Sequence, residues 1–240
     1  MKYAILGDIH ANLEALDAVL KDAGERGATH YACTGDVVGY NADPKACLQR
    51  LRALKCTVVQ GNHDYYAASN ESMELFTPMA QKSIRWTRKQ LSLLERRYLR
   101  QLPMIVDIEN FTIVHSSLNN PPRWNYIFTT KAAEANFRNQ FNSVCFFGHT
   151  HVPLAFVKDQ SIDKGFYETL DIHPGCQYLI NVGSVGQPRD RNPLAAYVIY
   201  DLEKQTVTMH RVEYEKKEAQ QKIRAAGLPF RNALRLDNGR

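Results

Sequence analysis

The chain has 240 residues, 44% of them hydrophobic, so it can bury a core of its own without disulfide or metal cross-links. Its net charge is +5, and residues 211–240 alone hold eight Lys and Arg against four Asp and Glu. Because the rest of the chain is nearly neutral, the charge gives no reason to expect a nucleic-acid partner.

The N-terminus and the cysteines bear on location. The apolar run of residues 3–6 is too short for the core of a signal peptide or for a membrane span. The five cysteines are an odd number without a Cys-x-x-Cys spacing, so we interpret them as small buried side chains in a reducing compartment. We therefore expect a cytoplasmic protein that is neither secreted nor inserted in a membrane.

The first half of the chain has the pattern of βαβ units, in which short apolar runs alternate with helical spacing of hydrophobic residues. Its expected elements are strands at 3–6, 30–34 and 56–60, with helices from about 12 to 24 and over 43–54. The second half is mostly strands, expected at 105–108, 111–114, 143–147, 152–157, 177–181, 195–200 and 206–212. We find no repeat and no linker, so a single domain over residues 1–240 is predicted.

Two segments are predicted to be helical additions to this domain. One spans about residues 68–102, is interrupted near Pro78 and ends before Pro103, and the other is the basic C-terminal tail, about 213–240. Within the first, residues 85–100 carry six Lys and Arg and a single Glu. We interpret this basic stretch as the solvated face of a long helix, with a rim that attracts an anionic substrate as the alternative.

Five apolar runs each end in residues that can bind a metal ion. The endings are Gly-Asp-Ile-His at 7–10, Gly-Asp at 35–36, Gly-Asn-His-Asp at 61–64, His115, and Gly-His-Thr-His at 148–151. In α/β sheets, ligands gather outside the carboxyl ends of the strands, so the five endings can converge on one site.

Seven side chains in these endings are candidate metal ligands: Asp8, His10, Asp36, Asn62, His115, His149 and His151. Residues two apart in an extended segment point to the same side, so Asp8 and His10 are expected to face one pocket, as are His149 and His151. Seven ligands are too many for one ion and suit two ions that share a carboxylate. Two cations about 3.5–4 Å apart act on both oxygens of an in-line displacement, which is phosphoryl chemistry.

These five blocks, in this order, resemble the calcineurin-like metallophosphoesterases. Residues 181–190, with the sequence Asn-Val-Gly-Ser-Val-Gly-Gln-Pro-Arg-Asp, add a likeness to the bacterial branch of phosphodiesterases and diadenosine-tetraphosphatase-like proteins. One departure is Ser116 after His115, where the family often has Gly. The resemblance implies an α/β fold of four layers, α-β-β-α, with two mixed β-sheets flanked by helices. The donor set, histidine and carboxylate without thiolate, suits two divalent transition-metal ions, which can be manganese, iron, zinc or cobalt.

The resemblance also implies roles for individual residues. The implied ligands are Asp8, His10 and His151 for the first ion, and Asn62, His115 and His149 for the second, with Asp36 between them. His63 is expected to protonate the leaving oxygen or stabilise the charge that develops, and Asp64 to orient the His63 imidazole.

Other residues could bind the substrate. Arg189 is a candidate because a guanidinium group can hold phosphate through two hydrogen bonds, although an exposed loop is an equal alternative. Four aromatic residues could stack on a nucleobase, although aromatic side chains in loops more often pack against the core: Tyr65, Tyr66, Trp124 and Tyr126.

The expected function is hydrolysis of a phosphodiester or phosphoanhydride in a small nucleotide-like substrate, with diadenosine polyphosphates as the leading candidates. The alternatives are a phosphoprotein Ser/Thr phosphatase, a nuclease, and a non-catalytic scaffold with the same fold. The seven ligands and His63 are all present, which favours an enzyme. The expected partner is a small phosphorylated substrate, with no membrane and no specific nucleic acid.

Overall fold

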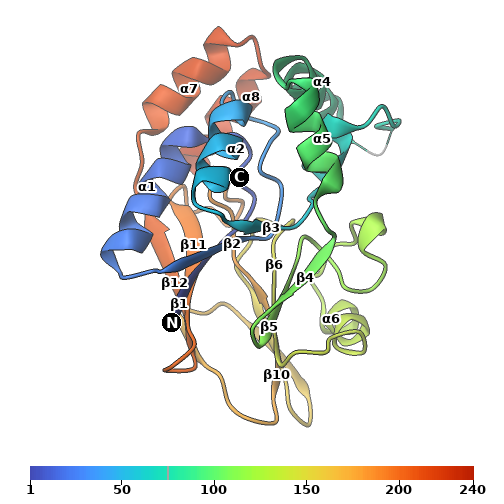
Figure 1. Cartoon of the computed structure of the whole chain (residues 1–240), viewed down its shortest axis with the longest axis vertical. Helices are drawn as coiled ribbons and strands as arrows, with labels where there is room; N and C mark the ends of the chain where they lie inside the picture. The colour runs from blue at the N-terminus through green and yellow to red at the C-terminus, as the bar shows by residue number, and fades with distance from the viewer. Residues whose placement is uncertain (75) are drawn as a thin grey trace.

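Two β-sheets packed face to face form the centre of the molecule, and helices cover their outer faces (Figure 1). The structure is a computed structural model that describes residues 1–74 and 76–240. Each sheet has six strands and contains both parallel and antiparallel pairs. The predicted α/β fold with two mixed sheets flanked by helices is confirmed.

The strands belong to the two sheets as follows. The first sheet has the order β3 (Thr57–Val58), β2 (His30–Cys33), β1 (Lys2–Leu6), β11 (Ala195–Asp201), β12 (Thr206–Val212) and β9 (Thr169–Asp171). The second sheet has the order β4 (Ile105–Ile108), β5 (Phe111–Val114), β6 (Val144–Phe147), β10 (Gln177–Asn181), β7 (Ala155–Lys158) and β8 (Ile162–Gly165).

The helices lie outside the sheets. They are α1 (Leu13–Glu25), α2 (Pro44–Ala53), α3 (Asn62–Ala68), α4 (Pro78–Gln90), α5 (Leu93–Gln101), the 3₁₀ turn η1 (Pro121–Arg123), α6 (Thr130–Phe137), α7 (Lys216–Ala225) and α8 (Phe230–Asn238). Helices α4, α5, α7 and α8 gather at one end of the molecule, at the top of Figure 1. In the part of the chain that the structure describes, no helix is both long and apolar enough to cross a membrane.

Alternate residues of β1 face opposite sides of the first sheet. Tyr3 and Ile5 pack in the core between the two sheets, whereas Ala4 and Leu6 pack in the layer beneath helices α1 and α2. Strand β6 alternates in the same way between the inner core and the layer that α6 covers. Because both faces of these strands are buried, their sequences are continuous apolar runs, which is why the strands could be predicted.

The predicted long helix over the basic stretch, residues 85–100, is wrong, because the structure has two helices there. Helix α4 ends at Gln90, and Ser92 begins α5: its hydroxyl accepts from Glu95 N at 3.3 Å, while the Glu95 carboxylate accepts from Ser92 N at 2.7 Å. This reciprocal cap starts a new helix. Pro78 likewise begins α4 instead of interrupting a helix, since proline is tolerated in the first turn.

Helix α8 is attached to the loop that follows β2. The side-chain amide of Asn232 donates to the backbone oxygen of Tyr40 at 2.8 Å and to the Ser83 hydroxyl at 3.0 Å. At its other end, the backbone oxygen of Gly239 accepts from Arg191 N at 2.8 Å. The C-terminal helix is therefore fixed to two loops that border the strand ends.

Candidate metal centre

The seven predicted ligands meet at one edge of the sheets. They follow β1, β2, β3, β5 and β6, and none is more than 7% exposed. Two glycines permit the close packing, because a Cβ on Gly61 would collide with Asp36, and one on Gly148 would collide with the Asp8 carboxylate. The segments that carry the ligands therefore approach one another more closely than other residues would allow.

The backbone at most of the ligands is left-handed. The φ angles are 50° at Asp8, 49° at His10, 53° at Asp36, 66° at His149 and 60° at His151. The expectation that each pair sits in an extended segment is wrong, because β1 ends at Leu6 and β6 ends at Phe147. The pairs reach the site through tight turns, a conformation that costs non-glycine residues energy and is concentrated at functional sites.

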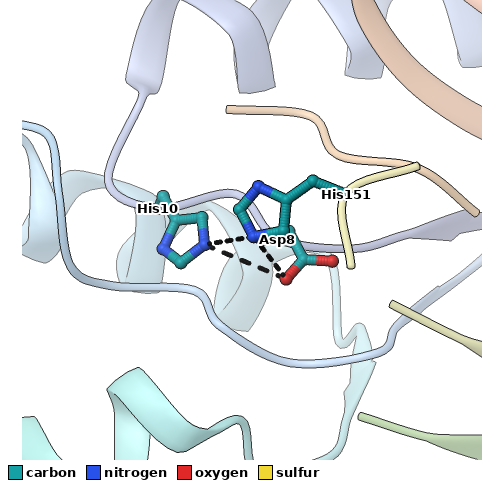
Figure 2. Close-up of side chains that lie close together, drawn as sticks. All are labelled: Asp8, His10 and His151. Carbon is teal, nitrogen blue, oxygen red and sulfur yellow. Dashed lines mark hydrogen bonds and ion pairs between the residues drawn. The ribbon is translucent and has the colours of Figure 1, made fainter. Parts of the chain in front are cut away.

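The first group of ligands consists of Asp8, His10 and His151 (Figure 2). The two imidazole Nε2 atoms lie 3.1 Å apart, and Asp8 Oδ1 lies 3.2 Å from His151 Nε2 and 3.9 Å from His10 Nε2. Asp8 Oδ1 is buried and has no hydrogen-bond partner among the described residues. These three atoms come from two segments far apart in the sequence, residues 8–10 and His151, and face one point.

The second group consists of Asp36, His115 and His149, with Asn62 beside them. His115 Nε2 lies 3.0 Å from Asn62 Oδ1, 3.1 Å from His149 Nδ1 and 3.5 Å from Asp36 Oδ2. Asp36 Oδ2 also lies 3.6 Å from His10 Nε2, in the first group. Asp36 therefore stands between the two groups, where the resemblance places it.

Hydrogen bonds on the outer side of the imidazoles set which nitrogen faces the centre. Three Nδ1 atoms lie next to backbone oxygens: His10 at 3.2 Å from Val38, His115 at 2.8 Å from Thr34, and His151 at 2.6 Å from Gln187. A carbonyl oxygen only accepts, so we assign the proton to each Nδ1. The Nε2 lone pairs then point to the centre, as in histidines that bind metal ions.

Burial sets the charge of these groups. It lowers the pKa of all four histidine ligands below the usual value, so the imidazoles are neutral, the form that binds metal ions. It also raises the pKa of Asp8 to about 6 and that of Asp36 well above its usual value. A bound cation acts on the carboxylates in the opposite direction, so the donor set fits a pair of cations.

His63 and Asp64 do not form the expected pair. The Asp64 carboxylate accepts from the backbone N–H groups of Val38 and Gly61, both at 3.1 Å, because the first turn of α3 directs it back to the helix start. In the part of the chain that the structure describes, His63 Nδ1 has no hydrogen-bond partner. The proposed orienting hydrogen bond is thus replaced by packing: the imidazole lies 4.4 Å from the Tyr40 ring, between ring centroids.

A cleft of about 280 Å³ opens over the two ligand groups. Arg189 lines it, as do three of the four candidate aromatic residues, Tyr66, Trp124 and Tyr126. The fourth, Tyr65, packs against Tyr66 and Trp124, with ring centroids at 5.1 and 6.4 Å. Sequence reasoning missed other lining residues, namely Tyr40, Phe76 and Arg123. Tyr40 could have been predicted to line the cleft, because it follows Asp36 by only four residues.

The basic stretch at residues 85–100 contributes no side chain to this cleft, as far as the described residues show. Arg88 donates to the backbone oxygen of Tyr66 at 2.7 Å, and Arg100 donates to that of Ala68 at 2.8 Å. These arginines satisfy carbonyl groups at the end of α3, where positive charge is favourable. The alternative of a substrate-attracting rim over this stretch is therefore not supported.

Residues 1–205 match the calcineurin-like phosphoesterase superfamily domain. The chain belongs to this family. The structure of a metallophosphoesterase from Sphaerobacter thermophilus is 39% identical in sequence, with a TM-score of 0.90 and coverage of 100% of this chain and 99% of that one. An uncharacterized protein of Methanocaldococcus jannaschii is 37% identical over 242 residues, covering 99% of this chain and 98% of its own. A putative diadenosine tetraphosphatase shares the fold, with 18% identity, a TM-score of 0.50 and coverage of 88% and 94%.

Proposed function

We propose that this calcineurin-like phosphoesterase uses two divalent transition-metal ions to hydrolyse a phosphodiester or phosphoanhydride in a small nucleotide-like substrate. The observation that carries the proposal is the place of Asp36, whose Oδ2 lies 3.6 Å from His10 Nε2 in one ligand group and 3.5 Å from His115 Nε2 in the other. A single carboxylate shared by two sets of neutral imidazoles suits a pair of cations.

Each residue has a part in the proposed reaction. The first ion would be held by Asp8, His10 and His151, the second by Asn62, His115 and His149, and both by Asp36. Two such ions, when bound, supply Lewis acidity toward the phosphate ester and toward water. His63 borders the same cleft, and its neutral imidazole keeps one N–H that can donate a hydrogen bond to the leaving oxygen and stabilise the charge that develops there.

The walls of the cleft favour a small anionic substrate with a flat base. Its volume, about 280 Å³, lies just below the range of roughly 300–1,000 Å³ for small-molecule sites. Tyr126 is 54% exposed, and its ring stacks on those of His149 and Phe128, with centroids 4.3 and 5.8 Å away, so it adds aromatic surface that a base could contact. Arg123 and Arg189 add positive charge. Diadenosine polyphosphates remain our leading candidates.

We also propose that the protein works in the cytoplasm. All five cysteines are free, and three of them are buried: Cys33, Cys47 and Cys145. Burial raises the pKa of Cys33 and Cys47 well above the usual value, so these thiols are unreactive side chains of the core. Such use of cysteine is typical of a reducing compartment.

Metal content and turnover test the proposal together. Protein purified without chelator should approach two equivalents of transition metal, and should hydrolyse bis-p-nitrophenyl phosphate with added manganese. Asp36→Asn should lower both metal contents and the rate, because it removes the shared negative charge. The control is Asp163→Asn, which removes an exposed carboxylate on β8. A limit of one equivalent would contradict the two-ion centre, and folded protein without turnover under any divalent metal would favour the scaffold alternative.

The substrate class is tested by comparing kcat/KM for diadenosine tetraphosphate, a cyclic nucleotide, a phosphopeptide and single-stranded DNA. We expect diadenosine tetraphosphate to give the highest value. A ranking led by the phosphopeptide or by DNA would replace the nucleotide-like substrate with a phosphoprotein or a nucleic acid, and would leave the two-ion chemistry in place.

A further inference from the structure

Helix α8 brings a second arginine next to Arg189. Arg189 Nη2 and Arg235 Nη1 each lie 3.4 Å from the same atom, the side-chain oxygen of Gln187. The two nitrogens are therefore at most about twice that distance apart. The family match ends at residue 205, so Arg235 lies beyond it, yet the similarity to the Sphaerobacter thermophilus protein covers the whole chain.

Among the described residues, no carboxylate lies within ion-pair distance of these two charges. Among residues 1–74 and 76–240, neither arginine forms an ion pair with a carboxylate, unlike Arg211, which pairs with Asp190. Two guanidinium groups this close repel each other unless a negative group lies between them. Burial, and then the charge of Arg189, lowers the pKa of Arg235 from its usual value.

Two buried hydrogen-bond donors beside the arginine pair have no acceptor among the described residues. Arg189 Nε and Gln187 Nε2 are both buried, and neither has a partner among the described residues. Buried donors are normally paired. A cluster that offers positive charge and leaves two of its N–H donors unpaired is complementary to an anion with several oxygens, which is the chemistry of a phosphate group.

The cluster is joined to the metal centre. The backbone oxygen of Gln187 accepts from His151 Nδ1 at 2.6 Å, and Arg189 N donates to the His151 backbone oxygen at 3.1 Å. The Arg189 guanidinium lies over the Tyr40 ring, 5.6 Å from its centroid, and the Asn232 side chain holds α8 to the backbone of Tyr40. Arg189 therefore lines the cleft, and Arg235 does not line it but adjoins Arg189 through Gln187, whose backbone contacts a candidate ligand, His151.

We propose that Arg189 and Arg235 together bind a second phosphate group of the substrate, adjacent to the phosphorus that is attacked. The inference rests on the proposed phosphoesterase function and narrows it: the substrate is a phosphoanhydride with at least two linked phosphates, not an ester with a single phosphorus. The metal ligands and His63 act at the reacting phosphate, and the arginine pair holds its neighbour. Arg235 is then a residue that determines specificity.

Steady-state kinetics of Arg235→Ala test this assignment. Loss of one charge-assisted contact should raise KM for diadenosine tetraphosphate about 10- to 100-fold, while kcat/KM for bis-p-nitrophenyl phosphate, which has one phosphorus, changes less than about twofold. Arg235→Lys should recover part of the loss. The matched control is Arg231→Ala, which removes the same group from an exposed position one turn earlier on α8. Equal effects of Arg235→Ala on both substrates, or of both variants on diadenosine tetraphosphate, would overturn the inference.

A binding measurement without catalysis separates this inference from the proposed function. In the presence of chelator, inorganic pyrophosphate should raise the thermal midpoint of wild-type protein and of Arg231→Ala, and should not raise that of Arg235→Ala. Absence of a shift in wild-type protein, or a shift that persists in Arg235→Ala, would contradict the arginine pair. If instead pyrophosphate behaves as expected and no phosphate ester is hydrolysed, the phosphoesterase function fails and the anion site stands.

Discussion

His63 lies among aromatic rings. Its ring centroid is 4.4 Å from that of Tyr40, 5.4 Å from that of Phe76 and 4.8 Å from that of His10. One imidazole nitrogen also falls within reach of His10 and Asp36, so geometry alone allows His63 to be a ligand or a proton donor. Substitution of His63 distinguishes the two roles: loss of a ligand would remove a bound metal ion, whereas loss of a donor would remove only turnover.

We expect His63→Ala to keep both metal ions and to lose turnover. Removal of one hydrogen-bond donor to a developing negative charge typically lowers the rate about 10²- to 10³-fold, most strongly for substrates with poor leaving groups. Elemental analysis and kcat measured on the same sample check both parts. The control is His173→Ala, at an exposed position away from the site. Loss of a metal equivalent together with the rate would make His63 a ligand instead.

At the scale of elements, helix α1 is attached to the first sheet by Asp22. Its carboxylate accepts from Arg26 Nε and from the Tyr197 hydroxyl, both at 2.7 Å. Burial acts to raise the pKa of Asp22, but the hydrogen bonds from Arg26 and Tyr197 outweigh it and lower this pKa below its usual value. A carboxyl group with a lowered pKa in the folded state stabilises the fold above its unfolded value, and this contribution disappears as the pH falls through the folded value.

Asp22→Asn should therefore reduce the free energy of unfolding at neutral pH by about 1 kcal/mol or less, because the group is partly exposed. The difference from wild type should be constant between pH 5 and 7 and shrink below about pH 4, where the carboxylate is protonated. Urea unfolding of the metal-free proteins at several pH values measures it. A difference that does not change with pH would mean that the packing of Asp22, not its charge, is what the variant removes.

Elements with one clear pattern could be predicted from the sequence, and elements defined by their neighbours could not. Strand β10 was predicted with its observed bounds, because most of its residues are buried. Strand β8 was missed, since three of its four residues are exposed and it has no apolar run. The strand expected at 152–157 begins only at Ala155, because Pro153 cannot donate to the ladder. Helix α3 was missed because its first residues read as ligands and catalytic groups.

At the scale of the whole molecule, the convergence of the candidate ligands was predictable and their surroundings were not. Each ligand follows an apolar strand, and strand ends converge by topology, so Asp36 and His115 could be placed without coordinates. Arg235 carries no such signal, since it lies in a basic tail and meets Gln187 across 48 residues. The partner of the Asp64 carboxylate likewise depends on how the loop around Val38 folds back. Contacts between distant loops are set by tertiary packing, which a local pattern does not record.

The left-handed backbone at the ligands implies a trade between stability and function. A non-glycine residue in this conformation costs about 1–2 kcal/mol relative to a right-handed one, and glycine avoids that cost. At His151, with φ 60°, histidine suits metal binding, whereas glycine would suit the backbone conformation better.

Without metal, His151→Gly should unfold at a higher temperature than His151→Ala, and both should lose the first ion. Equal melting temperatures for the two variants would show that the turn relaxes once the imidazole is gone. Metal ions that bind only the folded chain would offset the conformational cost of these residues. The metal supply of the cell would then be a determinant of how stable this protein is.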